Sequence, residues 1–187
     1  MPDALGTAIT NTNPDSCVTV HSGRLCKPWK ISQQGITFIA GWEAFRPHIY
    51  DNDGAGKGGN TTIGYGHLVH MGPISGAVSE AQFRNDITIA EARELLLLDL
   101  DYPEHILNRK IRVPLYQYEY DALACFVYNL PSGNAGLLSL VNSGHYDRVP
   151  AKFLEYTMAG GVRPRGLIKR RRSEGSLFKE GNYDHSH

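Results

Sequence analysis

The spacing of hydrophobic residues predicts a series of helices interrupted by one β element. Ser32 can cap a helix, and the apolar residues that follow it recur at helical spacing as far as Trp42. Pro47 disfavours helical geometry in the preceding residue, so this helix is expected to end by Arg46. The glycine- and acid-rich stretch 49–67 then contains adjacent β-favouring residues, which predicts a hairpin or a small irregular sheet.

A longer helical pattern follows a predicted loop over residues 71–85. Thr88-x-x-Glu91 is a capping-box sequence, and the helix it begins is expected to reach about Arg109, with Pro103 kinking or interrupting it. Another helix is predicted after Pro114. Shorter helices are predicted over 134–143, 147–158 and 165–178. The pattern therefore predicts one helix, a small β element and a mainly helical remainder.

Composition and charge narrow the class of protein. With 187 residues, 41% of them hydrophobic, the chain fits one globular domain with a short extension. Residues 1–30 show no sustained periodicity and are interpreted as that extension or a linker. The 19 basic and 19 acidic residues cancel, which argues against a dedicated nucleic-acid binder.

The neutral total is unevenly distributed. Residues 1–79 carry 5 acidic and 5 basic residues, 80–147 carry 10 and 5, and 148–187 carry 4 and 9, so the net charges are 0, −5 and +5. Within the basic segment, the cluster Arg170–Arg172 is interpreted as a solvated helix face, as a surface that attracts an anionic wall polymer, or as both.

No membrane span or secretory signal is expected. The run Leu95–Leu98 is far too short to cross a bilayer, and the N-terminus lacks a basic start and an apolar core. Cys17 and Cys26 lie in a polar stretch where either a small disulfide loop or two free thiols would fit. Cys125, in an apolar run, is expected to be a buried small hydrophobic residue.

The densest candidate chemistry is a group of carboxylates. Glu43 is expected at a helix end, and Asp51 and Asp53 follow in the predicted turn. Cleavage of a glycosidic bond uses such a pair, because one carboxyl group must stay protonated and the other ionised. Trp42 and Phe45 flank Glu43 and would give its carboxyl group an apolar setting.

Three other interpretations of the same stretch fail. A calcium loop beginning at Asp51 would need an acid at its last position, where this chain has Thr62. The glycines around Lys57 lack the strand and helix that flank a phosphate-binding loop. His67 and His70 have no third ligand at suitable spacing, so no metal site is expected there. No organic cofactor is expected either, because cleavage of a glycosidic bond by two carboxyl groups does not use one.

Longer motifs add a family resemblance. They are Glu43-Ala-Phe-Arg-Pro-His-Ile-Tyr50, Thr62-Ile-Gly-Tyr-Gly-His67, Ile87-Thr88 to Leu100, Phe126-Val-Tyr-Asn129 and Arg165-Gly-Leu-Ile-Lys-Arg-Arg-Arg-Ser-Glu174. With them the chain resembles the phage-type lysozymes of glycoside hydrolase family 24 over about residues 31–180, leaving 1–30 and a tail of 181–187 outside. The resemblance implies an α+β, mainly helical, two-lobed fold with a small β-hairpin lobe and a larger helical lobe.

The same resemblance implies hydrolysis of the β-1,4 bond between N-acetylmuramic acid and N-acetylglucosamine in peptidoglycan. It implies Glu43 as the general acid and Thr62 as the hydroxyl that helps to hold the attacking water. The position where the family has its aspartate holds Asn52, which could orient water but could not act as a base. We prefer Asp53 as the second acid, with Asp51 as the alternate.

Further roles are implied by the resemblance alone. Asn52, Tyr65, Asn129 and Ser132 are expected to bind substrate. His67 is expected to form a structural pair with Asp99. The family usually has a glycine-rich turn after the asparagine, and Leu130-Pro131 departs from it.

Two rival functions remain open at this point. A lytic transglycosylase would cleave the same bond by intramolecular attack, and a non-catalytic wall-binding module would have lost its aspartate. The expected partner is the peptidoglycan glycan strand. The protein is expected to be a monomer that binds no nucleic acid and does not insert stably into a membrane. Release by a holin or a secretion system would bring the protein to the periplasm or cell wall, as a phage endolysin or as a secreted effector with an immunity protein.

Overall fold

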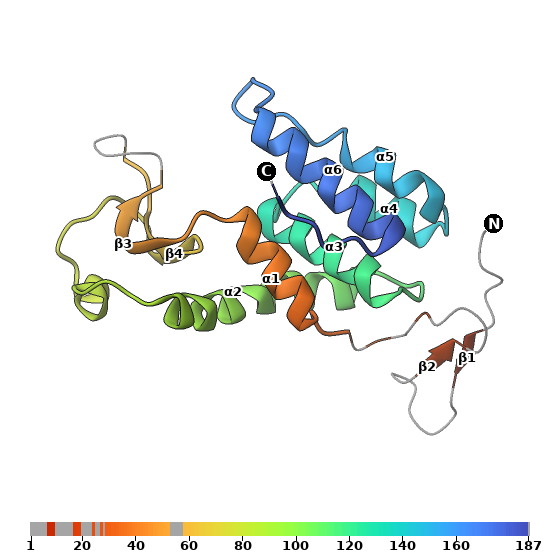
Figure 1. The fold of residues 1–187 in the computed structure, drawn as a ribbon, viewed down its shortest axis with the longest axis horizontal. Coiled ribbons are helices and arrows are strands. Elements are labelled where there is room, and N and C mark those ends of the chain that lie inside the picture. Colours follow the sequence, from red (N-terminus) through yellow and green to blue (C-terminus); the bar gives the residue numbers. More distant parts are fainter. Residues whose placement is uncertain are drawn as a thin grey trace. The chain divides into compact units, whose positions relative to one another are not determined.

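The computed structural model describes residues 7–9, 17–19, 24, 27, 29–52 and 58–186, with the first two segments described by their backbone alone (Figure 1). The chain divides into two compact units, residues 39–101 and the two segments 1–38 and 102–187. The elements are β1 (Thr7–Ile9), β2 (Cys17–Thr19), α1 (Gln33–Trp42), β3 (Arg46–Asp51), β4 (Thr61–Gly64), β5 (His67–His70), η1 (Val78–Phe83), α2 (Ile89–Lys110), α3 (Gln117–Asn129), α4 (Ala135–Asn142), η2 (Tyr146–Arg148), α5 (Val149–Phe153) and α6 (Arg165–Glu180).

The unit 39–101 contains an antiparallel sheet in the order β3-β4-β5. Its central strand is buried along its whole length, with Ile63 fully inaccessible. Gly64 and Gly66 adopt φ values of 66° and 92°, a left-handed conformation that suits glycine, and so allow the tight turn from β4 to β5. The predicted loop 71–85 contains the short 3-10 helix η1. It was missed in the sequence analysis because its hydrophobic residues show no sustained helical spacing.

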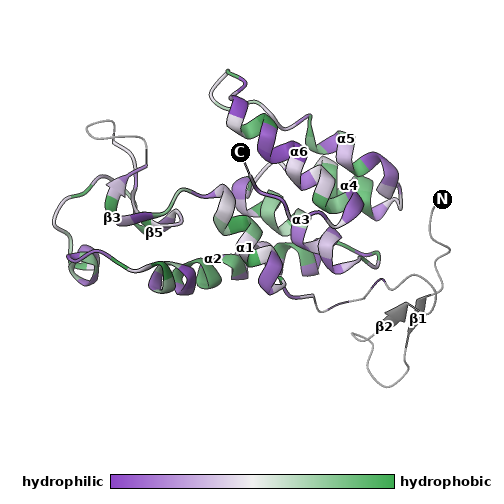
Figure 2. Cartoon of the chain, in the orientation of Figure 1, coloured by the Kyte–Doolittle hydropathy of each residue, from purple (hydrophilic) through white to green (hydrophobic). Residues whose placement is uncertain are grey.

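Helix α2 begins with the predicted capping box. The Thr88 hydroxyl accepts the Glu91 N–H at 3.2 Å, and the Glu91 carboxylate accepts the Thr88 N–H at 2.7 Å. Pro103 lies inside the helix without interrupting it. Figure 2 shows hydrophilic and hydrophobic residues alternating along α2, and among the described residues no helix is both long and apolar enough to cross a membrane.

The core of the other unit forms around α3, in which every residue from Glu119 to Val127 is buried. Phe126 packs edge-on against Phe153 at 5.3 Å between ring centroids, and Phe153 continues the cluster to Phe178 at 6.2 Å. Each such ring contributes about 1.5–3 kcal/mol by leaving water. These aromatic contacts join α3, α5 and α6.

The helix predicted over 147–158 is shorter than expected. It consists of η2 and α5 and ends at Phe153. The Thr157 hydroxyl donates to the Leu154 carbonyl at 3.1 Å and in turn accepts from Arg163 at 2.7 Å. A side-chain bond of this kind competes with the next helical turn, which explains why the helix ends early.

Side chains that lie before and after the predicted domain in the sequence pack against the helical unit. Arg24 is 4% exposed, and its guanidinium pairs with Glu119 at 2.7 Å. Trp29 is 5% exposed, and the Tyr183 hydroxyl donates to Asp121 at 2.7 Å. The domain limits at residues 30 and 180 remain a prediction. These contacts show that residues on the outer side of both limits pack against the helical unit.

Candidate active site

Glu43 lies directly after α1 and shortly before β3. Its backbone N–H donates to the Ala40 carbonyl at 3.3 Å, which closes the last turn of the helix, and the residue is half-buried. The other end of α1 is held by Ser32, whose hydroxyl accepts the Gly35 N–H at 3.0 Å and donates to Asp121. The predicted cap therefore forms, and a well-defined helix end carries the candidate acid.

Thr62 lies on the central strand β4, opposite Tyr50 of β3. It is 4% exposed, and its hydroxyl donates to the Tyr50 carbonyl at 3.1 Å. Because the hydroxyl proton is engaged in this way, the oxygen presents lone pairs, which accept hydrogen bonds, to any other partner. That orientation suits a group that holds a water molecule through one of the water's protons.

The three candidate positions for the second acid differ in what they contact. Asp51 accepts the Ile74 N–H through its carboxylate at 2.9 Å. Asn52 bonds twice to Asn60, accepting its N–H through the side-chain oxygen at 2.8 Å and donating its own N–H to the carbonyl at 3.1 Å. Asp53 lies outside the described residues.

Two further predicted residues of this unit have structural partners. Tyr65 is 8% exposed, and its ring packs against Phe45 at 5.7 Å between centroids. His67 lies with Nδ1 at 3.0 and 3.1 Å from the two carboxylate oxygens of Asp99, so the pair implied by the family resemblance is present.

Asn129 and Ser132 belong to the helical unit. The Asn129 side-chain oxygen accepts from Arg171 at 2.6 Å, which directs its NH₂ group the other way. Ser132 is exposed in the turn after α3. Asn134 closes that turn, donating to the carbonyls of Leu130 and Pro131 at 3.1 Å each. A side-chain amide thus stabilises the turn that departs from the family's glycine-rich sequence.

Both interpretations of the basic cluster on α6 are wrong for two of its three residues. Arg170 is 5% exposed and Arg171 is 1% exposed, and both donate to the fully buried Glu174; only Arg172 is exposed. Residues three and four apart share a helix face, so the glutamate meets both arginines on the face covered by α3. Cys125 is buried as expected, but its thiol donates to Glu174 at 3.3 Å instead of meeting only apolar groups.

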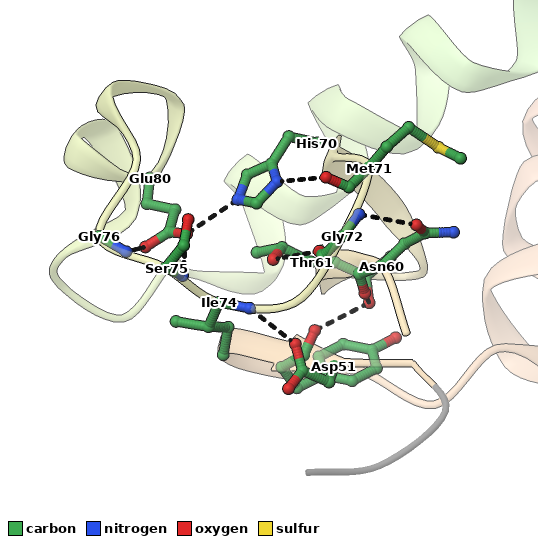
Figure 3. A network of polar contacts seen from close by, with 12 residues as sticks. Asp51, Asn60, Thr61, His70, Met71, Gly72, Ile74, Ser75, Gly76 and Glu80 are labelled. Carbon is green, nitrogen blue, oxygen red and sulfur yellow. Dashed lines mark hydrogen bonds and ion pairs between the residues drawn. The ribbon is translucent and has the colours of Figure 1, made fainter. Parts of the chain in front are cut away.

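A charged pair near β5 was missed by the sequence analysis, which considered His70 only as a metal ligand. His70 Nε2 lies 2.8 Å from the Glu80 carboxylate (Figure 3). The Ser75 amide, the His70 ring and the Gly76 amide lower the pKa of Glu80 to about 2. The Met71 carbonyl and then Glu80 raise the pKa of His70 above 6.5. No spacing rule links the two residues.

The choice between a disulfide and two free thiols at Cys17 and Cys26 falls outside what the structure describes, because Cys26 and the side chain of Cys17 are not among the described residues and side chains. Within the described residues, no group of three or more His, Cys, Asp or Glu side chains is arranged to hold a metal ion.

Comparison with known proteins identifies the family. Residues 40–174 match the sequence profile of the family described as Phage lysozyme, which covers well over half of the chain. The chain belongs to the phage lysozyme family. Among relatives, the endolysin of Salmonella phage P22 is 34% identical over 152 residues, covering 80% of this chain and 97% of that endolysin.

Other members of the phage lysozyme family are longer. The endolysin of Bacillus phage PZA is 31% identical over 155 residues, which cover 81% of this chain but 56% of that endolysin. Among solved structures, the muramidase domain of SpmX from Asticaccaulis excentricus superposes with a TM-score of 0.65 at 29% identity, covering 81% of this chain and 99% of that domain. The resemblance and the mainly helical fold with a small antiparallel sheet are confirmed.

Proposed function

We propose that this chain is a peptidoglycan hydrolase that cleaves the β-1,4 bond between N-acetylmuramic acid and N-acetylglucosamine. The family match over residues 40–174, which contains both Glu43 and Thr62, carries the proposal. The endolysin and muramidase relatives support an enzyme that degrades the bacterial cell wall. We further propose that this chain acts on the wall as a monomer, after release from the cell that makes it.

In the proposed reaction, Glu43 donates a proton to the leaving glycosidic oxygen as the bond to the anomeric carbon breaks. Water attacks that carbon and gives its proton to a second carboxylate, while the Thr62 hydroxyl accepts one of the water's hydrogen bonds. The Tyr50 carbonyl supports this role, since it takes the hydroxyl proton and leaves the oxygen as an acceptor.

Asp53 is the proposed second carboxylate. The contacts of the two neighbouring residues support this choice. The Asp51 carboxylate already accepts the Ile74 N–H, and the Asn52 side-chain oxygen already accepts the Asn60 N–H. Separate substitutions Asp53→Asn and Asp51→Asn distinguish the candidates. We expect the first to abolish wall lysis and the second to retain most of it; the reverse order would transfer the role to Asp51.

Tyr65, Asn129 and Ser132 are proposed to contact the glycan. The orientation of Asn129 supports a donor role, since Arg171 holds its oxygen and its NH₂ group can reach a carbonyl or hydroxyl oxygen of the sugar. An Asn129→Asp substitution, which removes those donors, is expected to raise KM for peptidoglycan fragments.

The decisive experiment compares Glu43→Gln with the wild type in clearing a suspension of purified cell walls. Removing a general acid lowers the rate by about 10²–10⁴-fold. Glu94→Gln, an exposed carboxylate on α2, is the matched control and should keep full activity. Equal clearing by Glu43→Gln and wild type would refute the assignment, and no clearing by either would favour the non-catalytic wall-binding module.

Mass spectrometry of the released fragments separates hydrolysis from the transglycosylase alternative. Hydrolysis adds one water to each cleaved bond and yields a reducing sugar, whereas intramolecular attack yields an anhydro-sugar lighter by one water. We expect reducing ends only, and anhydro ends would replace the hydrolase with a lytic transglycosylase.

A further inference from the structure

A short connection after β5, residues 71–76, is bonded to the end of the sheet that carries Thr61. We refer to it as the strap. The Gly72 carbonyl accepts both the N–H of Thr61 at 2.8 Å and its hydroxyl at 3.0 Å. Two residues later, the Ile74 N–H donates to the Asp51 carboxylate at 2.9 Å (Figure 3). The strap therefore joins the ends of β3 and β4, and the residue after Thr61 is the candidate water-holding threonine.

A charged pair holds the strap at its two ends. Glu80 accepts the N–H groups of Ser75 at 2.8 Å and Gly76 at 2.9 Å, and it meets His70 Nε2 at 2.8 Å. On the other side of the ring, His70 Nδ1 lies 2.9 Å from the Met71 carbonyl. The Glu80 side chain is 7% exposed and the His70 side chain 20%, so solvent screens the pair only partly.

Both ring nitrogens of His70 thus face oxygens that can only accept hydrogen bonds. A neutral imidazole carries one N–H, so it can satisfy only one of these oxygens, whereas the imidazolium form satisfies both. The charged groups acting on His70 are Glu80 from η1 and Asp51 from β3, and both favour the protonated ring. The geometry therefore selects the imidazolium form.

We propose that His70 and Glu80 are positioning residues for catalysis: the imidazolium–carboxylate pair holds the strap, and the strap holds the sheet end from which Thr62 presents its hydroxyl. This inference rests on the proposed function for the role of Thr62. Neither residue touches the reacting atoms in this scheme, because each acts through the backbone of the strap.

The pair is complete only within a defined pH range. His70 has a raised pKa, so its contribution is fully present below 6.5 and is lost as pH rises through the folded value. Glu80 has a pKa lowered to about 2, so its contribution is present above 4.5 and is lost as pH falls through about 2. The position of Thr62 should accordingly change with the deprotonation of His70.

A nuclear magnetic resonance titration tests this coupling without any substrate. The side-chain ¹⁵N shifts of His70 should report a doubly protonated ring below pH 6.5, and the Thr62 methyl signal should shift as the ring loses its proton. In His70→Gln, the pH dependence of the Thr62 signal should disappear. His48→Gln, a 65% exposed histidine on β3 with Asp86 at 3.9 Å, is the matched control and should leave that dependence unchanged.

Kinetics on soluble peptidoglycan fragments provides the second readout. Below pH 6.5, where the pair is complete, His70→Gln and Glu80→Gln should each lower kcat about tenfold with little change in KM, as expected for misplaced catalytic groups. In wild type, kcat should also fall as His70 loses its proton, and Gln at this position should remove that step. Thermal unfolding followed by circular dichroism verifies that each variant is folded at the assay temperature.

The outcomes separate this inference from the proposed function. A Thr62 signal that ignores the titration of His70, or unchanged kcat in both variants, would overturn the positioning role while leaving the hydrolase intact. An inactive wild type in which Thr62 still follows His70 would overturn the proposed function and uphold the coupling.

Discussion

Replacing Glu174 with glutamine should destabilise the helical unit far more than its conservative nature suggests. The Glu174 carboxylate is fully buried and accepts from Arg170 Nε at 3.2 Å and from Arg171 Nη1 at 2.9 and 2.7 Å. It also accepts the Cys125 thiol at 3.3 Å. Glutamine keeps the side-chain volume but removes the negative charge, and its NH₂ group then faces a guanidinium donor.

The magnitude follows from the burial of the arginines. Their side chains are 6% and 1% exposed for Arg170 and Arg171, so water cannot replace the lost carboxylate. Removing one partner of a buried ion pair costs about 3–5 kcal/mol, because the remaining charge stays buried. For a chain of this size, that loss lowers Tm by about 10 °C.

The matched control lies on the same helix. Lys179 and Glu180 form an ion pair at 3.2 Å whose side chains are 66% and 57% exposed. Such a pair contributes about 0–1 kcal/mol, so Glu180→Gln should leave stability nearly unchanged.

Urea unfolding followed by far-ultraviolet circular dichroism measures both variants, and the slope against urea concentration should match the wild type if the unfolding transition is the same. If Glu174→Gln lowers the free energy of unfolding by less than about 1 kcal/mol, as the control does, the reasoning is refuted, because a buried charge without a partner destabilises a protein by more than that.

Three further predictions concern smaller changes. Gly35→Ala should cost about 1–3 kcal/mol, because the new Cβ would lie 2.6 Å from the Asp121 carboxyl carbon, whereas Gly166→Ala, with nothing within 4 Å, should be neutral or stabilising in the same urea assay. Thr88→Ala should cost about 1 kcal/mol through the lost helix cap, visible as a lower urea midpoint. The stability difference between wild type and His70→Gln should shrink as pH rises above 6.5, measured by Tm at several pH values.

The fold could be predicted wherever local chemistry decides it. Ser32 caps α1, and Thr88 begins α2 through contacts within the next three residues, so the signal and its structural effect lie in the same few positions. The helix predicted over 147–158 was too long: α5 ends at Phe153, and Thr157 instead bonds to the Leu154 carbonyl and to Arg163, a contact that the local pattern does not contain. Local rules therefore located starts better than ends.

The candidate site was predictable to the same extent. The resemblance to the phage-type lysozymes implied the roles of Glu43 and Thr62 and the pairing of His67 with Asp99. All four residues lie within one unit, and the pair is present in the structure, whereas the catalytic roles stay a prediction. The pair of His70 and Glu80 escaped, because the two residues are joined only when the strap folds back from β5 to η1.

The sequence by itself determined the order of the main helices and the place of the β element between them, the caps and the family, because these depend on neighbouring residues and on motif spacing. Only the tertiary structure decided which charges are buried. Arginines such as Arg170 and Arg171 usually lie on a solvated surface. Here they are buried, because they pair with Glu174 and α3 covers them. The state of a charged group depends on what surrounds it in space, through desolvation and Coulomb interactions with partners distant in the chain.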